Sequence, residues 1–334
     1  MGRSRPRRLL AALVGALLVA GCARAPQSIL DPAGPVARAQ YRLFTFDVAM
    51  VTGIGVVMAF LILYAVFRFR RRGSAGGLPP QVDGNRRLEI GWTLAAVLVL
   101  IPLAVEPIKD EFALAAPPPG QDVLQVRVVG HQWWWEFEYP DLGIVTANEL
   151  HIPTGQPVQL TITSADVLHS FWVPRLGGKM DAVPGRQNKL WLQADEPGTY
   201  LGQCAELCGT SHANMRLRVI AQTAAEFEAW VRTRQNPVTQ PQSDLAARGQ
   251  AKFQQTCAAC HTVDGTPAKG KVGPNLTGVG SRTTIAAGML QNTDENLARW
   301  LQNPPAVKPG ALMPNLNLKK EEIEALVAYL RGLK

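Results

Sequence analysis

Charged residues are scarce in this chain, and so are cysteine and histidine. Asp, Glu, Lys and Arg make up 18% of the 334 residues, against about 25% in ordinary soluble domains. There are five cysteines, five histidines and no internal repeat. The low charge argues against an entirely soluble protein and reflects apolar segments near the N-terminus. The cysteines, although few, all fall in short motifs that have their own chemistry.

Positive charge is in excess, and its placement indicates a membrane protein rather than a nucleic-acid-binding one. The formal net charge is +8. Cytoplasmic flanks of membrane helices collect Lys and Arg, and the arginines here flank apolar runs. We therefore expect no nucleic-acid partner. The flanking residues are Arg3, Arg5, Arg7, Arg8, Arg68, Arg70, Arg71, Arg72, Arg86 and Arg87.

The N-terminus has the pattern of an export signal. Arginines precede an apolar run, Leu9–Ala20, that is short for a membrane span. Small residues then lead to Cys22. This resembles a bacterial lipoprotein signal and predicts removal of residues 1–21, lipidation of Cys22 and an exported segment over residues 22–42. The alternative is a first membrane helix with an incidental cysteine.

Two further apolar runs predict a transmembrane helical hairpin over residues 43–110. Leu43–Phe67 and Leu88–Ile108 can each cross a bilayer core at about 1.5 Å per residue. The arginines at 68–72 mark the cytoplasmic side. Both outer ends then lie on the exported face. We expect a multi-pass protein of a bacterial inner membrane whose later domains lie on the periplasmic or outer face.

The remaining sequence predicts a β domain followed by an α domain. Residues 120–222 contain short alternating or β-branched segments between Gly and Pro turns, as in a sandwich or barrel. A short helix and a polar linker occupy residues 223–243. Residues 244–334 have helical periods between Gly/Pro loops and are expected to fold independently. The expected strands are Val123–Val129, Gln156–Thr163, Lys189–Gln193 and Met215–Ala221, and the expected helices are Glu226–Arg234, Asp244–Gln255, Asp294–Gln302 and Lys320–Leu330.

The first cysteine motif, in the β domain, has the composition of a copper site. Cys204 and Cys208 are four residues apart, and His212 follows four residues later. Met215 closes the pattern. Soft thiolates with imidazole and thioether select copper over hard cations, and two thiolates can bridge a pair of copper ions. A second histidine must come from elsewhere, and His169, after a predicted strand, is the candidate.

Other interpretations of this cysteine pair are a disulfide, a copper-chaperone motif and part of a zinc site. Met215 taken alone would more often be a core residue than a ligand. The complete C-x-E-x-C-x-x-x-H-x-x-M pattern favours dinuclear copper.

The second cysteine motif, in the α domain, is typical of covalently attached haem. Cys257 and Cys260 directly precede His261. A redox dithiol and half of a zinc site are the alternatives. The expected export of this domain favours haem, because c-type haem is attached to exported proteins.

The segment from about Ala39 to Ala221 resembles subunit II of the haem-copper cytochrome c oxidases, with its dinuclear CuA site. The motifs that carry the resemblance are Gly130–Trp135, Asp166–Phe171, Asp181–Arg186 and the cysteine loop. The resemblance implies a cupredoxin-like fold in which both cysteines bridge two copper ions. It also implies the remaining ligands, with His169 and Met215 on one copper and His212 with the Glu206 carbonyl on the other. The Glu206 side chain would reach a magnesium ion at the interface with subunit I.

The same resemblance suggests two roles beside the metal. An aromatic residue at the Trp133 position lies over the copper site in this family and is where electrons enter, whereas a tryptophan in a strand would otherwise be core. Three successive tryptophans, Trp133–Trp135, cannot all face inward from one strand.

Glu89 matches a family position at the mouth of a proton-uptake channel, and its other interpretation is a solvated helix end.

Residues Leu245–Leu330 resemble class I cytochrome c. The resemblance implies thioether bonds from Cys257 and Cys260 to haem, with His261 and Met313 as axial ligands. Met/His ligation suits a high-potential electron carrier. Met289 is the competing methionine, but the Met-Pro sequence at 313 fits the family pattern better.

Together these features predict a multidomain membrane protein with a two-helix hairpin, an all-β cupredoxin-like CuA domain and an all-α class I cytochrome c domain. The resemblance implies an electron-transfer subunit of a cytochrome c oxidase that passes electrons from haem c through CuA to catalytic subunit I. Oxygen reduction and proton pumping would occur in subunit I. Subunit III is an expected partner, and a cytochrome c or a quinol:cytochrome c reductase is the expected donor.

Three other classes of protein can be compared with this prediction. A nitrous oxide reductase shares the cysteine loop but needs a histidine-rich propeller, and five histidines exclude it. A quinol oxidase subunit II lacks the cysteine loop. A membrane-anchored copper-delivery protein stays as the alternative function. Such a protein binds copper that a mild chelator can remove, so resistance of the bound copper to a chelator would exclude it.

Overall fold

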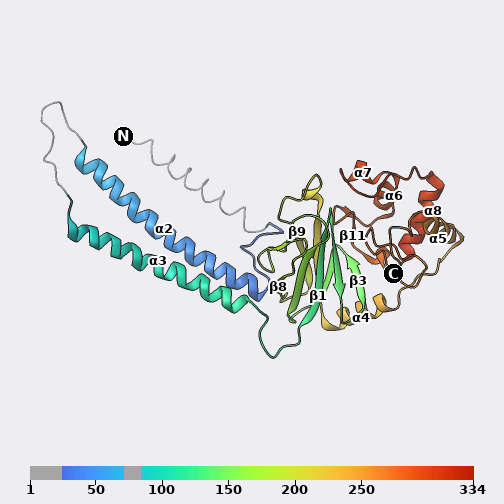
Figure 1. Ribbon diagram of the computed structural model, residues 1–334, viewed down its shortest axis with the longest axis horizontal. Coiled ribbons are helices and arrows are strands. Elements are labelled where there is room, and N and C mark those ends of the chain that lie inside the picture. Colours follow the sequence, from blue (N-terminus) through green and yellow to red (C-terminus); the bar gives the residue numbers. More distant parts are fainter. Residues whose placement is uncertain (1–24, 71–83) are drawn as a thin grey trace, which may run out of the picture. The chain divides into compact units, whose positions relative to one another are not determined.

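The computed structural model describes residues 25–70 and 84–334, which form two compact units (Figure 1). One unit is the helical segment 39–115, and the other joins residues 116–334 to those up to Arg38. The proposed signal, with Cys22, and the loop at 71–83 lie outside the described residues.

The helical unit consists of two long apolar helices, which confirms the expected pair of spans. Helix α2 is Pro35–Phe69 and helix α3 is Arg86–Leu114. Both are long and apolar enough to cross a membrane. α3 contains Pro102 and Pro107, which a membrane helix tolerates better than a soluble one. Each helix is longer than its apolar run, because helical geometry continues into the polar flanks.

Ten strands form a sandwich of two five-stranded sheets. In the first sheet the order is β3-β2-β1-β5-β8, and in the second it is β4-β10-β9-β6-β7. Parallel pairing of β1 with β5 and of β4 with β10 sets the topology. The strands are β1 Leu124–His131, β2 Trp134–Tyr139, β3 Ile144–Ala147, β4 Glu149–Pro153, β5 Val158–Ser164, β6 His169–Trp172, β7 Met180–Ala182, β8 Asn188–Leu192, β9 Gly198–Cys204 and β10 Arg216–Gln222.

Strand β2 shows how the sequence fills the core of this sandwich. Trp135, Phe137 and Tyr139 are fully buried, whereas the residues between them are half-buried. This alternation follows from the two-residue period of a strand. Trp133 precedes β2 and lies in a turn, so the expectation that it belongs to the strand is wrong. The turn frees its ring from the alternation and lets it be buried as well.

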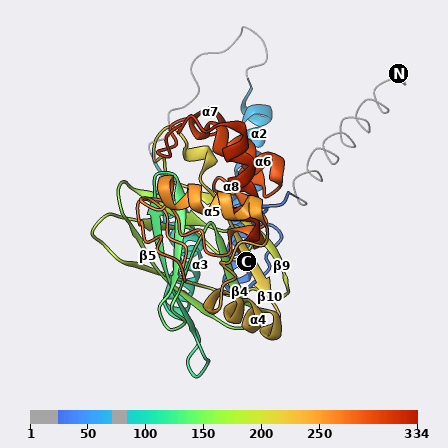
Figure 2. The same ribbon diagram turned by 90° about the vertical axis from the view of Figure 1, so that its right-hand side faces the viewer.

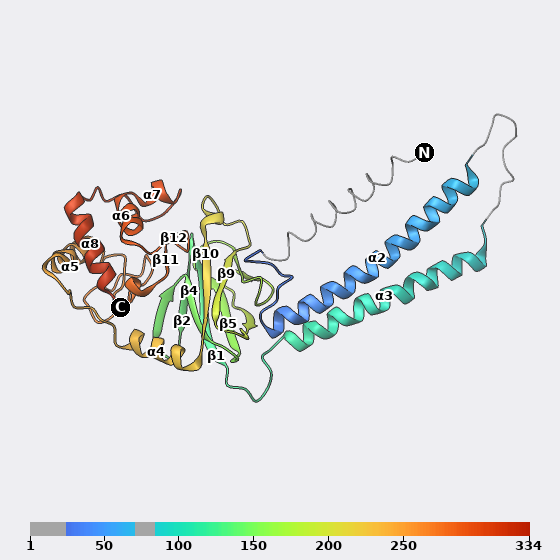
Figure 3. The same ribbon diagram turned by 180° about the vertical axis from the view of Figure 1, so that it is seen from behind.

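The β domain ends in helix α4, Ala224–Gln235, which packs against the core of the sandwich (Figure 3). Thr223 caps the helix, and its hydroxyl and the Glu226 side chain form a reciprocal capping box. Phe227 and Trp230 are the buried residues of the apolar face.

The C-terminal domain is helical, with α5 and α8 crossing each other (Figure 2). Gly249 of α5 lies at the crossing, where a Cβ atom would overlap the Ala325 carbonyl of α8. A second hydrophobic core fills this domain. Its elements are α5 Asp244–Thr256, the 3₁₀ helix η2 Val279–Ser281, β11 Thr284–Ile285, β12 Leu290–Gln291, α6 Asp294–Gln302, α7 Pro304–Val307 and α8 Lys320–Gly332. The other 3₁₀ turn of the described residues, η1 His212–Asn214, belongs to the β domain and lies in its cysteine loop.

The β domain and the helical C-terminal domain belong to one compact unit and contact each other directly. Glu149 at the start of β4 is 1% exposed and accepts hydrogen bonds from the backbone amides and hydroxyls of Thr283 and Thr284, at 2.5–3.2 Å. The Arg216 amide of β10 donates to the Ala287 carbonyl at 3.2 Å. The segment 236–243 therefore connects two domains that are packed together.

Candidate functional site

Strand pairing brings the two parts of the first site together, although they are far apart in the sequence. β6 pairs with β9 so that Phe171 lies opposite Cys204, which places His169, at the start of β6, beside the cysteine loop. The loop leaves β9 at Cys204 and returns through the 3₁₀ turn at His212 to β10. The sandwich thus provides a rigid frame for this loop.

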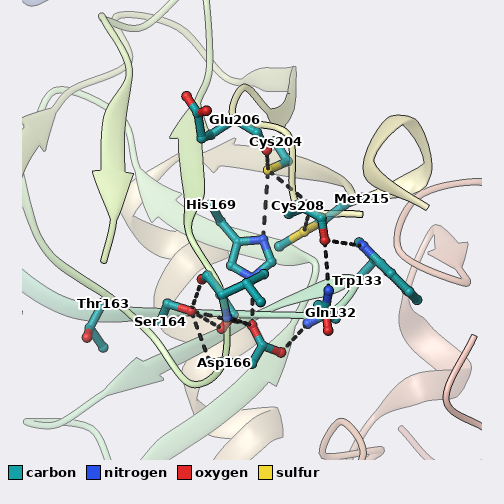
Figure 4. Close-up of polar contacts among 12 residues, drawn as sticks. Gln132, Trp133, Thr163, Ser164, Asp166, His169, Cys204, Glu206, Cys208 and Met215 are labelled. Carbon is teal, nitrogen blue, oxygen red and sulfur yellow. Dashed lines mark hydrogen bonds and ion pairs between the residues drawn. The ribbon is translucent and has the colours of Figure 1, made fainter. Parts of the chain in front are cut away.

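The side chains proposed as copper ligands converge on the two sulfur atoms (Figure 4). Cys204 Sγ and Cys208 Sγ are 3.8 Å apart. His169 Nδ1 lies 3.9 Å from the first sulfur, and His212 Nδ1 lies 3.6 Å from the second. Met215 Sδ is 3.9 Å from Cys208 Sγ. The Glu206 carbonyl oxygen is 3.3 Å from Cys204 Sγ, so every proposed ligand atom reaches one small region.

The electrostatics of this cluster fit a cation. Cys204, Cys208 and His169 are all buried, and their ligand atoms lie within 4.8 Å of one another. Burial, and then the neighbouring Cys204, raise the pKa of Cys208 to about 12. Two adjacent thiolates are unfavourable without a positive charge between them, and metal ligands must be deprotonated. The donor set therefore fits soft copper ions.

Asp166 holds His169 in place, a role that the motif alone did not reveal. Its Oδ1 atom is 2.8 Å from His169 Nε2, so the other ring nitrogen faces the sulfurs. Its Oδ2 atom accepts a hydrogen bond from the backbone amide of Gln132 at 2.6 Å. Burial would raise the pKa of Asp166, but the hydrogen bonds from His169, Gln132 and Val167 outweigh it and lower the pKa. A carboxylate of this kind orients a metal-binding imidazole.

Trp133 lies directly against the cysteine loop. Its Nε1–H donates to the Cys208 carbonyl at 3.0 Å, and the side-chain amide of Gln132 donates to the same oxygen at 2.8 Å (Figure 4). Trp133 is 8% exposed. It therefore touches the backbone of one proposed copper ligand.

The haem motif lines a pocket with Met313. Cys257, Cys260 and His261 line this pocket, and so does Met313. His261 Nδ1 is 2.8 Å from the Pro274 carbonyl. A carbonyl can only accept, so Nδ1 carries the proton and Nε2 is left for a metal. Met289 does not line the pocket. The residues present thus fit a covalently bound haem with His261 and Met313 on its iron.

The β domain supplies part of the same pocket. Its contribution comes from the turn between β1 and β2, from the first residue of β2 and from the residue between β3 and β4: Gln132, Trp133, Trp134 and Asn148. Trp134 also stacks on His131, with ring centroids 4.2 Å apart. Trp133 consequently borders both proposed sites. Its role in electron entry, which the family resemblance implies, stays a prediction.

Glu89 is at the N-terminal end of α3, in the helical unit. Its Oε1 accepts the backbone amide of the N-cap residue Asn85 at 3.2 Å. This contact is the ordinary one for an acidic residue in a first helical turn. A role in proton uptake stays a prediction.

Comparisons with known proteins match all three parts of the chain. The transmembrane-domain family of cytochrome c oxidase subunit II matches residues 24–109, and the periplasmic-domain family of the same subunit matches residues 142–222. The cytochrome c family matches residues 246–334. Domains of these kinds imply copper in the β domain and haem in the C-terminal domain.

Relatives span nearly the whole chain. Cytochrome c oxidase subunit 2 of Alkalihalophilus pseudofirmus is 40% identical over 311 residues, which are 91% of this chain and 90% of that protein. The protein of the same name in Bacillus subtilis is 39% identical over 98% of this chain and 97% of its own length. Quinol oxidase subunit 2 of Bacillus subtilis is 35% identical but covers only 70% of this chain and 73% of its own length.

Solved structures include the periplasmic domain of subunit II of cytochrome oxidase from Bradyrhizobium japonicum, which is 34% identical. It covers 35% of this chain and 96% of that one, with a TM-score of 0.34. The relatives that match from end to end settle the family: the chain belongs to cytochrome c oxidase subunit 2, a membrane-bound component of a multisubunit oxidase, here with a cytochrome c domain at its C-terminal end.

Proposed function

We propose that this subunit accepts electrons in its cytochrome c domain, passes them to a dinuclear copper site in its β domain and delivers them to catalytic subunit I. Bound haem and copper supply the one-electron carriers. Oxygen reduction and coupled proton pumping belong to the partner subunit. A cytochrome c or a quinol:cytochrome c reductase is the proposed donor.

The observation that carries this proposal is the position of Trp133. Its indole donates to the Cys208 carbonyl at 3.0 Å and also borders the pocket of Cys257, His261 and Met313. One aromatic side chain thus contacts both proposed sites. Such contact suits an electron relay, whereas a copper-delivery protein has no use for it.

The proposed ligands have separate tasks. Cys204 and Cys208 would bridge two copper ions, with His169, His212, Met215 and the Glu206 carbonyl completing the set. Asp166 would keep the His169 ring in its binding orientation. The Glu206 side chain is the proposed ligand of magnesium at the contact with subunit I.

In the cytochrome c domain, Cys257 and Cys260 would attach the haem, and His261 and Met313 would bind its iron. Pro274 fixes the tautomer of His261 through its carbonyl. Arg282 lines the pocket and is almost fully buried, so its guanidinium places a positive charge beside the haem position.

The test of the order of transfer uses the purified oxidase complex. In Cys204→Ser, we expect the donor to reduce haem c at the normal rate, while subunit I stays oxidised because the copper bridge is lost. Stopped-flow absorbance at the haem c and subunit I bands separates the two steps. Normal reduction of subunit I in this variant would contradict the proposal. Loss of copper from the unaltered complex to a mild chelator would favour the copper-delivery alternative.

A further inference from the structure

The loop that carries Met313 is attached to the β domain at its opposite end. Lys308 is the C-cap residue that follows helix α7, and its Nζ donates to the Trp133 carbonyl at 2.5 Å. The next residue, Pro309, accepts a hydrogen bond from Ser211 Oγ at 2.6 Å. Ser211 directly precedes His212 in the cysteine loop. The segment 308–313 therefore runs from the copper side of the interface to the haem side.

Gly310 brings this loop close to the Trp133 ring. Its φ is +82°, in the region that glycine adopts without strain. A Cβ atom at this position would lie 3.0 Å from Trp133 Cη2 and Cζ3 and 3.2 Å from Thr210 Cβ. Glycine thus meets two requirements at once, the turn of the loop and its close approach to the indole.

Lys308 is buried at the contact between the two domains, although burying a lysine costs free energy. The residue is 4% exposed, and within the described part of the chain no ion pair with a carboxylate is found for it. Burial lowers the pKa of Lys308 to about 7. A buried ammonium normally needs a partner to offset its lost hydration. Its hydrogen-bond acceptor is a carbonyl 175 residues away in the chain, across the domain boundary.

A second anchor lies beside the same pocket. The buried Glu149 carboxylate accepts the amides and hydroxyls of Thr283 and Thr284, and Thr284 lines the pocket. The two anchors are on different segments of the cytochrome c domain. Two separated points of attachment resist rotation of one domain on the other, which a single hydrogen bond would allow.

We infer that Lys308 is a positioning residue for electron transfer: it fixes the Met313 loop to the Trp133 turn, so that the cytochrome c domain stays docked on the copper domain instead of docking transiently. This inference rests on the proposed function. A polar linker such as 236–243 would otherwise let the domains separate and return. Fixed docking keeps Trp133 between the two sites at every turnover.

The experiment compares Lys308→Met with Lys320→Met in the intact oxidase complex. Methionine keeps an apolar stem of similar length and removes the ammonium. Lys320 is a suitable control because its side chain is 83% exposed on α8. Thr283→Val is a milder second variant, since it removes one hydroxyl donor to Glu149 and keeps the backbone donors. Each complex is first checked for its haem c and copper spectra.

Two measurements follow. Pulsed EPR gives the distribution of distances between the oxidised copper site and ferric haem c, and flash-induced reduction gives the rate of transfer at low and high glycerol. We expect a narrow distribution and a glycerol-independent rate in the unaltered and Lys320→Met complexes. Lys308→Met should broaden the distribution and give a glycerol-dependent rate about tenfold slower, because the hydrogen bond from Lys308 to the Trp133 carbonyl is lost. Thr283→Val should slow transfer about threefold.

A narrow distance distribution and an unchanged rate in Lys308→Met would overturn the inference. Absence of haem-to-copper transfer in the unaltered complex would instead overturn the proposed function, and the EPR distances would still report whether Lys308 holds the domains together. The two failures are therefore distinguishable.

Discussion

At the scale of single residues, a short-range motif was sufficient to predict four of the proposed copper ligands. Cys204, Cys208, His212 and Met215 lie within one loop, so their spacing already limits how far apart they can be. Asp166 is different. Its contact with His169 depends on how the chain turns before β6, and an aspartate three residues before a histidine has no fixed geometry outside that turn.

Asp166→Asn should weaken copper binding by about 10- to 100-fold, because an amide orients the His169 imidazole less well than a carboxylate does. Copper retained after dialysis against a graded chelator measures the effect. Asp141→Asn, on an exposed turn, is the matched control and should retain copper normally. Equal retention in both variants would show that Asp166 does not support the site.

Met313→His should keep the haem attached and lower its reduction potential, because thioether ligation raises that potential. The long-wavelength charge-transfer band of Met-ligated ferric haem should disappear. Potentiometric titration and absorption spectra measure both effects, with Met289→Leu as the control because Met289 does not line the pocket. If the band survives in Met313→His, another residue is the ligand.

At the scale of elements, the sequence predicted the type of most segments and missed features that depend on packing. The alternation in β5 and the helical period of α8 are local signals, and both elements formed as expected. The turn at Trp133 has no such signal. The close crossing of α5 and α8 at Gly249 also could not be predicted, because a glycine in a helix has several explanations.

Gly249→Ala should destabilise the cytochrome c domain by about 3 kcal/mol, because the new methyl group would overlap the Ala325 carbonyl and push the helices apart. Gly332→Ala is the matched control, since nothing lies within 4 Å of a Cβ atom there. Thermal unfolding followed at the haem Soret band compares them. Similar midpoints for the two variants would contradict the packing described for α5 and α8.

The packing of α4 should make the stability of the β domain depend on pH. The His151 ring stacks on Trp230 of α4, with ring centroids 4.5 Å apart. Burial lowers the pKa of His151 to about 4, below the value of 6.5 expected for the unfolded chain. The unfolded chain then binds more protons between these values, so stability falls as the pH decreases from 6.5 to 4, by about 3 kcal/mol.

His151→Phe keeps a ring against Trp230 and removes the titration, so its stability should change less over this pH range. Near-UV circular dichroism of the tryptophans follows thermal unfolding of the full chain in detergent. The same pH dependence in both proteins would assign the effect to other groups.

At the scale of the whole molecule, the three kinds of domain were predictable, but the contact between two of them was not. Composition separates the membrane helices from the exported domains, and the two cysteine motifs separate the copper and haem regions. The polar residues at 235–243 suggested independent domains. Packing between Glu149, Thr283, Trp133 and Lys308 joins residues more than 100 positions apart, and no local pattern marks such pairs.

The central claim is that Trp133 connects the haem pocket to the copper loop. It is tested most directly by flash-induced electron transfer from reduced haem c to copper in Trp133→Ala, with Trp133→Phe as a graded control that keeps a ring and removes the indole donor. We predict intact copper and haem spectra in both variants, transfer at least about tenfold slower in the alanine variant, equivalent to a barrier higher by about 1.4 kcal/mol, and an intermediate rate in the phenylalanine variant. An unchanged rate in Trp133→Ala would contradict the account and leave Trp133 as a core residue of the β domain.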